Sequence, residues 1–291
     1  MKQKSGVTFG NGWMFSALIF LLKHIPIRVF YAFMSIFVIP VTLVVSPGAR
    51  LTYRYFRRHR HQGRWQSWLS VYRNHCVFGQ TVIDKFAMYA GHQFRIAYHG
   101  LEKYEELVAA DGPLIILNAH IGCSEIVGYS YRVSKPCNVL AYGGEKAQLM
   151  ALRSASFGEM NMRMIPVGTA DSHSDEIIEA LDRGEIVTAF ADRFANRRKV
   201  LTSHIHGDAV NLSRGPISLA VTRGIPVIMA SAMKEKDGSY SAFITVLGYD
   251  RTQPSKVQRQ QLADAYTAEI NRLLDKYPMQ WFNYFNIWVE S

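Results

Sequence analysis

Short apolar runs alternate with segments of helical periodicity along most of the chain, and this alternation limits the possible folds more than any other feature. The apolar or period-two runs predict strands at residues 94–98, 114–117, 139–142, 163–167, 186–190, 226–231 and 242–247. The spacing of apolar side chains predicts helices at residues 65–89, 100–110, 145–160, 174–183, 215–222 and 255–276. Strands that alternate with helices are typical of a sheet covered by helices, so we predict a single α/β sandwich domain.

Two apolar runs precede this domain, at residues 13–22 and 29–45, with charged residues between them. They are too long and too interrupted for a signal peptide, and each is marginal for the roughly 20 residues that a membrane span needs. The charged fraction of 19% is below the roughly 25% of soluble domains. We therefore predict a membrane-associating helical segment at 1–50 and the α/β domain at 51–291. Two alternatives remain: a hairpin within one leaflet, or two buried core helices.

A basic and aromatic cluster follows the apolar runs, in a chain whose formal net charge is +10. Its arginines are Arg50, Arg54, Arg57, Arg58, Arg60 and Arg64. Arginines and aromatic residues beside an apolar run suit an anionic membrane surface, and the positive-inside tendency places them on the cytoplasmic side. The same residue types also bind single-stranded nucleic acid. Since no nucleic-acid motif accompanies them, we expect no nucleic-acid partner.

The cysteine and histidine patterns argue against a metal site. Cys76, Cys123 and Cys137 form no CxxC pair, and their odd number suits a reducing compartment. His204 and His206 have no third ligand at a suitable spacing. We therefore expect neither a metal nor a cofactor. A nucleophilic role for the thiol at position 123 is an alternative to the small buried residue that we predict there.

The stretch Asn118-Ala119-His120 follows directly on the strand predicted at 114–117, and Glu125 lies five residues after the histidine. Catalytic groups of α/β folds tend to lie just past the carboxyl ends of strands. A carboxylate on one ring nitrogen would fix the tautomer, leaving the other nitrogen to take a proton from a hydroxyl or an amine. HxxxxE alone is a weak pattern, and a structural histidine at a helix start is the alternative. The strand before it and the basic N-terminus favour a catalytic pair.

Blocks further along the chain resemble one family. They are Asp192-Arg193, the stretch at 206–220 with Gly-x-Ala and Gly-Pro-x-x-Leu-Ala, Gly224-Ile225-Pro226-Val227-Ile228 and Tyr277-Pro278-x-Gln280-Trp281. With the HxxxxE motif, they are similar to the lipid A late acyltransferases, within the lysophospholipid acyltransferase superfamily. The resemblance implies an α/β acyltransferase domain in which His120 is the base and Glu125 its orienting acid. It also implies an acyl carrier protein thioester, or a coenzyme A thioester, as the acyl donor.

The end of the chain departs from that family. Residues 282–288 read Phe-Asn-Tyr-Phe-Asn-Ile-Trp, whereas the lipid A enzymes continue with a tryptophan, a histidine and a basic run. The tail looks more like relatives that acylate amino-acid lipids or polyene glycolipids. We therefore expect the acceptor to be a hydroxyl or amine of a membrane lipid or glycolipid precursor at the inner (cytoplasmic) membrane. A non-catalytic lipid- or carrier-binding protein with the same fold is the alternative function.

Six further residues are expected to contact substrate, because they belong to these blocks, follow predicted strands or carry a guanidinium suited to phosphate. They are Asn118, Arg153, Asp192, Arg193, Asn211 and Arg214. The arginine at 153 is equally compatible with a solvated charge on a helix. The pair at 211 and 214 precedes a predicted helix start, where backbone N–H groups can hold an anion.

Overall fold

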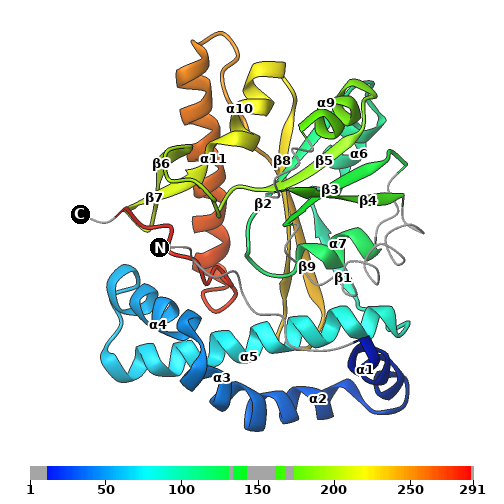
Figure 1. The fold of residues 1–291 in the computed structure, drawn as a ribbon, viewed down its shortest axis with the longest axis vertical. Helices are drawn as coiled ribbons and strands as arrows, with labels where there is room; N and C mark the ends of the chain where they lie inside the picture. The colour runs from blue at the N-terminus through cyan, green and yellow to red at the C-terminus, as the bar shows by residue number, and fades with distance from the viewer. Residues whose placement is uncertain (1–11, 131–133, 143–160, 168–173, 290–291) are drawn as a thin grey trace.

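A computed structural model describes residues 12–130, 134–142, 161–167 and 174–289. Its main element is a seven-stranded, mostly parallel sheet with the strand order β1-β9-β8-β2-β5-β3-β4 (Figure 1). The strands are β1 (Ile96–His99), β2 (Leu114–Asn118), β3 (Cys137–Tyr142), β4 (Met162–Val167), β5 (Ile186–Phe190), β8 (Val227–Lys234) and β9 (Tyr240–Val246). β9 runs antiparallel to β8 and parallel to β1. The predicted α/β class is confirmed.

Helices cover both faces of the sheet. They are α6 (Leu101–Ala109), α7 (Ser124–Ser130), α9 (Ser174–Asp182), α10 (Arg214–Arg223) and α11 (Ser255–Lys276). The central strand β2 is buried along its whole length. Ile115 and Leu117 belong to the large cluster that includes α10 and α11, whereas Leu114 and Ile116 pack in the cluster with α6. This two-sided burial explains why the strand reads as a continuous apolar run. The helix predicted at 145–160 lies outside the described residues.

A second, antiparallel pair of strands was not predicted from the sequence. It consists of β6 (Val200–Ile205) and β7 (Asp208–Ser213), and its turn contains His206 and Gly207, both with positive φ. The amide of Ser213 donates to the carbonyl of Ala191, at 2.7 Å. The end of the hairpin therefore lies beside the end of β5, and α10 begins directly after β7.

The N-terminal apolar runs form helices on the outside of the molecule. α1 (Gly12–His24) precedes a continuous helix made of α2 (Ile27–Phe33), η1 (Met34–Val38) and α3 (Ile39–Val45). The second helix is long and apolar enough to cross a membrane, and only 6% of it is buried. Its outer face carries Val29, Phe33, Ile36, Phe37, Val41 and Val44, all exposed. The alternative of two buried core helices is therefore wrong.

The long helix α5 (Arg64–Tyr89) separates this apolar layer from the sheet (Figure 1). The helix at 27–45 packs along one side of α5, and the other side of α5 faces the body. The segment between the helix at 27–45 and α5 forms α4 (Pro47–Arg54), which continues into η2 (Tyr55–His59) and also packs on α5. α4 crosses the domain boundary that was expected at residue 50.

A buried charge cluster joins the apolar layer to the body. Asp84 of α5 is fully buried and pairs with Lys234 of β8, whose side chain is 5% exposed. The same carboxylate accepts hydrogen bonds from Tyr240 of β9 and from Tyr31 of α2. Three separate elements therefore depend on one carboxylate, which fixes the apolar helix against α5 and the sheet.

Removal of the Asp84 charge is expected to destabilise the fold strongly. An Asp84→Asn variant would leave the Lys234 ammonium buried without a counter-charge, which costs about 3–5 kcal/mol of unfolding free energy. Denaturant titration of the protein in detergent micelles measures this loss. Asp237→Asn is the matched control, because its carboxylate pairs with Arg95 where both side chains are exposed, so the loss should stay below about 1 kcal/mol. Equal losses in the two variants would contradict the structural role of the cluster.

Candidate active site

The register of two neighbouring strands brings His120 and Asp192 together. β2 and β5 are parallel and adjacent, with Asn118 opposite Phe190, so the second residue past each strand end lies at the same edge of the sheet. His120 Nδ1 is 2.8 Å from one carboxylate oxygen of Asp192, and the His120 amide donates to the other oxygen at 2.8 Å. Carboxyl ends of parallel strands are where α/β proteins commonly bind ligands.

The Asp192 carboxylate is positioned to hold the imidazole in one tautomer. Its side chain is completely buried, whereas that of His120 is 27% exposed. Burial alone would raise the pKa of Asp192, but the charge and hydrogen bonds of His120 outweigh it, and the pKa lies below its ordinary value. An ionised carboxylate accepts a hydrogen bond from Nδ1–H, so Nε2 carries the free lone pair. No residue that the structure describes hydrogen-bonds to Nε2.

Glu125 occupies a different position from the one that the sequence suggested. It lies in the first turn of α7, and Oε1 accepts from Lys85 Nζ of α5 at 2.7 Å. The contact with His120 Nδ1 that was expected of Glu125 is made by Asp192 instead. Asp192 reaches His120 because β2 pairs with β5. The five-residue spacing from His120 to Glu125 does not reveal which strands are neighbours. A catalytic contribution of Glu125 itself stays a prediction.

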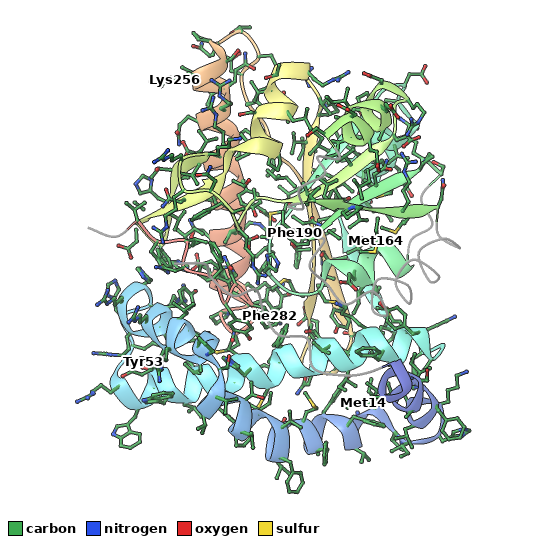
Figure 2. All side chains as sticks on the ribbon, viewed as in Figure 1. Met14, Tyr53, Met164, Phe190, Lys256 and Phe282 are labelled. Atoms are coloured by element: carbon green, nitrogen blue, oxygen red, sulfur yellow. The ribbon has the colours of Figure 1, made fainter. Side chains whose placement is uncertain are left out.

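The turn that carries His120 is fixed from both sides by backbone hydrogen bonds. The C-terminal tail supplies one side: the Phe282 amide donates to the His120 carbonyl at 2.7 Å, and the Gly122 amide donates to the Gln280 carbonyl at 2.8 Å. β8 supplies the other, because the Cys123 amide donates to the Ala232 carbonyl at 2.7 Å. Figure 2 shows Phe282 between the sheet and α5.

The tail is itself held by α5. The side-chain amide of Asn74, which is buried, donates to the carbonyls of Met279 and Trp281 at 3.0 and 2.9 Å. The Tyr284 hydroxyl donates back to the Asn74 side chain at 3.1 Å. Asn283 then completes the site, because its Nδ2 donates to the Asp192 carbonyl at 2.9 Å. Sequence reasoning missed Asn74 and Asn283, and no local motif marks them.

Gly122 is expected to tolerate no side chain. Its φ is +59°, and a Cβ there would lie 2.2 Å from the carbonyl oxygen of Ala232. Gly122→Ala should lower the free energy of unfolding by about 2–3 kcal/mol, because strain and a backbone clash combine. Gly238→Ala is the matched control, since its φ of +89° is also positive but an added Cβ would have no atom within 4 Å. A denaturant titration that gave equal losses would contradict the clash with β8.

Four further predicted residues lie on different elements of the fold. The side chain of Asn118 is buried and accepts from the Ala230 amide at 3.2 Å, so it ties β2 to β8 from within the sheet. Arg193 is exposed, and its guanidinium donates to Asn283 Oδ1 at 3.4 Å. Asn211 lies within β7, and Arg214 begins α10 with an exposed side chain. Arg153 lies outside the described residues.

The alternative chemistries weighed from the sequence find little support in the geometry. Cys123 is buried, and this burial raises the pKa of its thiol to about 12, so the thiol is protonated at neutral pH and is a poor nucleophile. A ring nitrogen of His206 is 3.1 Å from the Tyr55 hydroxyl, and burial lowers the pKa of His206 to about 4. In the part of the chain that the structure describes, no group of three or more acidic, histidine or cysteine side chains is arranged to hold a metal.

Comparisons with known proteins add no further assignment. No protein-family model matches the chain, and no curated protein matches its sequence.

Proposed function

We propose that the protein is an acyltransferase that moves a fatty acyl chain from a thioester to a hydroxyl or amine of a membrane lipid or glycolipid precursor. The observation that carries this proposal is the His120–Asp192 pair at the carboxyl edge of the sheet. A buried carboxylate orients the imidazole, and the His120 side chain is 27% exposed. This is the arrangement of a general base.

The reaction needs no nucleophile from the protein. Nε2 of His120 takes the proton of the acceptor group as that group attacks the thioester carbonyl carbon. The tetrahedral oxyanion then collapses, the carbon–sulfur bond breaks, and the leaving thiolate receives the proton from the imidazolium. The products are an acylated lipid and a free thiol. Asp192 stabilises the imidazolium while it exists.

Three observations support a membrane lipid as the acceptor. An apolar helix at 27–45 lies on the outside of the molecule, arginines follow it, and the motifs resemble the lipid A late acyltransferases. We infer that the protein lies at the inner membrane, with its catalytic domain on the cytoplasmic side, where the basic residues face an anionic surface. By the same resemblance, the donor is an acyl carrier protein thioester, with coenzyme A as the second choice.

The proposal is tested by lipid mass spectrometry of cells with and without the protein, beside incubation of the purified protein with acyl carrier protein thioester. We expect one lipid class to gain an acyl chain only when the protein is present. We also expect slow release of free thiol from the thioester without acceptor. If neither change occurs, a non-catalytic lipid- or carrier-binding protein with the same fold becomes the better account.

A further inference from the structure

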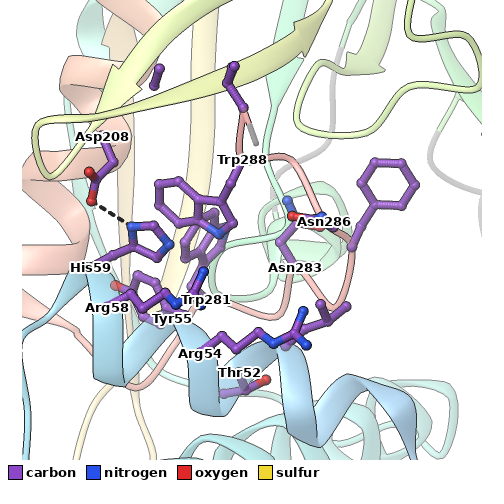
Figure 3. Close-up of a pocket in the computed structure, with 14 residues that line it drawn as sticks. Thr52, Arg54, Tyr55, Arg58, His59, Asp208, Trp281, Asn283, Asn286 and Trp288 are labelled. Atoms are coloured by element: carbon purple, nitrogen blue, oxygen red, sulfur yellow. Dashed lines mark hydrogen bonds and ion pairs between the residues drawn. The ribbon is translucent and has the colours of Figure 1, made fainter. Parts of the chain in front are cut away.

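A pocket of about 480 Å³ lies between the N-terminal helices and the C-terminal tail. One wall is formed by Arg54 of α4 and Arg58 of η2, and the tail contributes Trp281, Asn283 and Trp288 to the other (Figure 3). The volume falls in the range of small-molecule sites, and the lining combines aromatic faces with a few polar groups.

The arginines at this pocket have an unusual charge environment. Arg54 and Arg58 are one helical turn apart, and they also line a second hollow together with Arg50 and Arg57. Among the residues that the structure describes, no carboxylate pairs with Arg50, Arg54 or Arg58. Like charges at this spacing repel each other. A bound anion would offset this repulsion.

Among the described residues that line the pocket, the one carboxylate is already engaged. Asp208 of β7 lies 2.5 Å from Nδ1 of His59. The His59 ring in turn stacks on Trp288 with centroids 3.4 Å apart and an interplanar angle of 9°. The stacking on His59 holds the Trp288 indole in place as one wall of the pocket. The Asp208 carboxylate pairs with His59, so it does not neutralise Arg54 or Arg58.

The tail connects this pocket to the His120–Asp192 pair, although neither residue of the pair lines it. Asn283 lines the pocket and donates to the backbone carbonyl of Asp192. Trp281 lines it as well, and its backbone forms a bridge with Ile121, the residue after His120. A group bound here would therefore contact the tail segment that holds the His120 turn, and this favours a ligand that belongs to a substrate.

We propose that this pocket binds the phosphate of one of the two substrates, through Arg54 and Arg58. A guanidinium group can donate two parallel, charge-assisted hydrogen bonds to the oxygens of one phosphate. Asn283 and Asn286 supply neutral polar atoms beside them. The inference deepens the proposed function. The phosphate comes either from the phosphopantetheine arm of the donor or from the headgroup of the lipid acceptor.

The test compares matched ligands that differ only in phosphate. The full chain in neutral detergent micelles is titrated calorimetrically with 4′-phosphopantetheine against pantetheine, and with dihexanoyl phosphatidic acid against dihexanoylglycerol. We expect the phosphate-bearing member of one pair to bind about tenfold or more tightly than its partner. The pair that shows the preference identifies the donor or the acceptor as the source.

An Arg54→Gln/Arg58→Gln variant should reduce that preference to within about twofold, because the neutral amides lose the charge-assisted bonds. Both side chains are exposed, so the thermal midpoint should not change. Lys236→Gln/Arg251→Gln removes the same charge from two exposed positions outside the pocket and should retain the preference. An Arg54→Lys/Arg58→Lys variant should retain part of it.

Two results would overturn the proposal: no phosphate preference in the wild type, or an undiminished preference in the glutamine variant. If the glutamine variant instead lost only its attachment to phosphatidylglycerol vesicles, the arginines would serve the membrane surface. The titrations measure binding without turnover. A failure of the pocket assignment can therefore be distinguished from a failure of the proposed function. An inactive protein that prefers phosphate leaves the pocket assignment intact, and an active protein without the preference removes it.

Discussion

Replacement of His120 by alanine is expected to lower the rate of acyl transfer by about 10³-fold or more. The variant loses the imidazole that is proposed to take the acceptor proton, and the Asp192 carboxylate is fully buried. The rate should be followed as acyl chain appearing in lipid, at saturating thioester. His120 is partly exposed and its backbone contacts to Asp192 and Phe282 do not need the side chain. The fold should therefore survive the change.

His99→Ala is a matched control for this loss. His99 lies at the end of β1, the edge strand farthest from β2 on that side of the sheet, and its ring stacks on Phe243. It should keep most of the activity and a similar circular dichroism spectrum. Full activity of a folded His120→Ala protein would contradict general-base catalysis by this residue.

Asp192→Asn is expected to lower the transfer rate by about 10²–10⁴-fold, with the base still present. The amide removes the negative charge that stabilises the imidazolium, and its NH₂ group favours the wrong tautomer of His120. The thermal midpoint should fall only modestly, since asparagine has nearly the same shape. The measurement is the transfer rate of the purified variant with the same thioester and acceptor.

The comparison with Glu125→Gln decides which carboxylate orients the base. The structure gives Asp192 the contact with His120 Nδ1 and pairs Glu125 with Lys85, so the glutamine variant should retain more activity than Asp192→Asn. The reverse order would return the orienting role to Glu125. A loss in Glu125→Gln as large as that of His120→Ala would give Glu125 a direct part in the reaction.

The sheet could be predicted from the sequence because each strand carries its own signal. β2 is buried on both faces and therefore reads as a continuous apolar run, and β5 does the same. α11 was predicted at 255–276, because a long helix that packs one side on the core repeats its apolar residues at a fixed spacing. The candidate base was found for a related reason, since it directly follows a recognisable strand.

The partners of the base were harder to predict, because they depend on which strands are neighbours. Asp192 was placed at a strand end, but only the pairing of β2 with β5 brings it to His120. Asn74 and Asn283 act on the site from α5 and from the tail, at sequence separations that carry no periodic signal. Local spacing therefore favoured Glu125, the nearest carboxylate in sequence.

The central claim is tested most directly by following a radiolabelled acyl chain from acyl carrier protein thioester into extracted membrane lipid. With purified wild-type protein, the label lost from the thioester should appear in one lipid as an ester or an amide, and His120→Ala should leave it on the thioester. Two results would contradict the proposed mechanism. One is equal transfer of label by the wild type and by a folded His120→Ala protein, and the other is no transfer by the wild type with any lipid fraction.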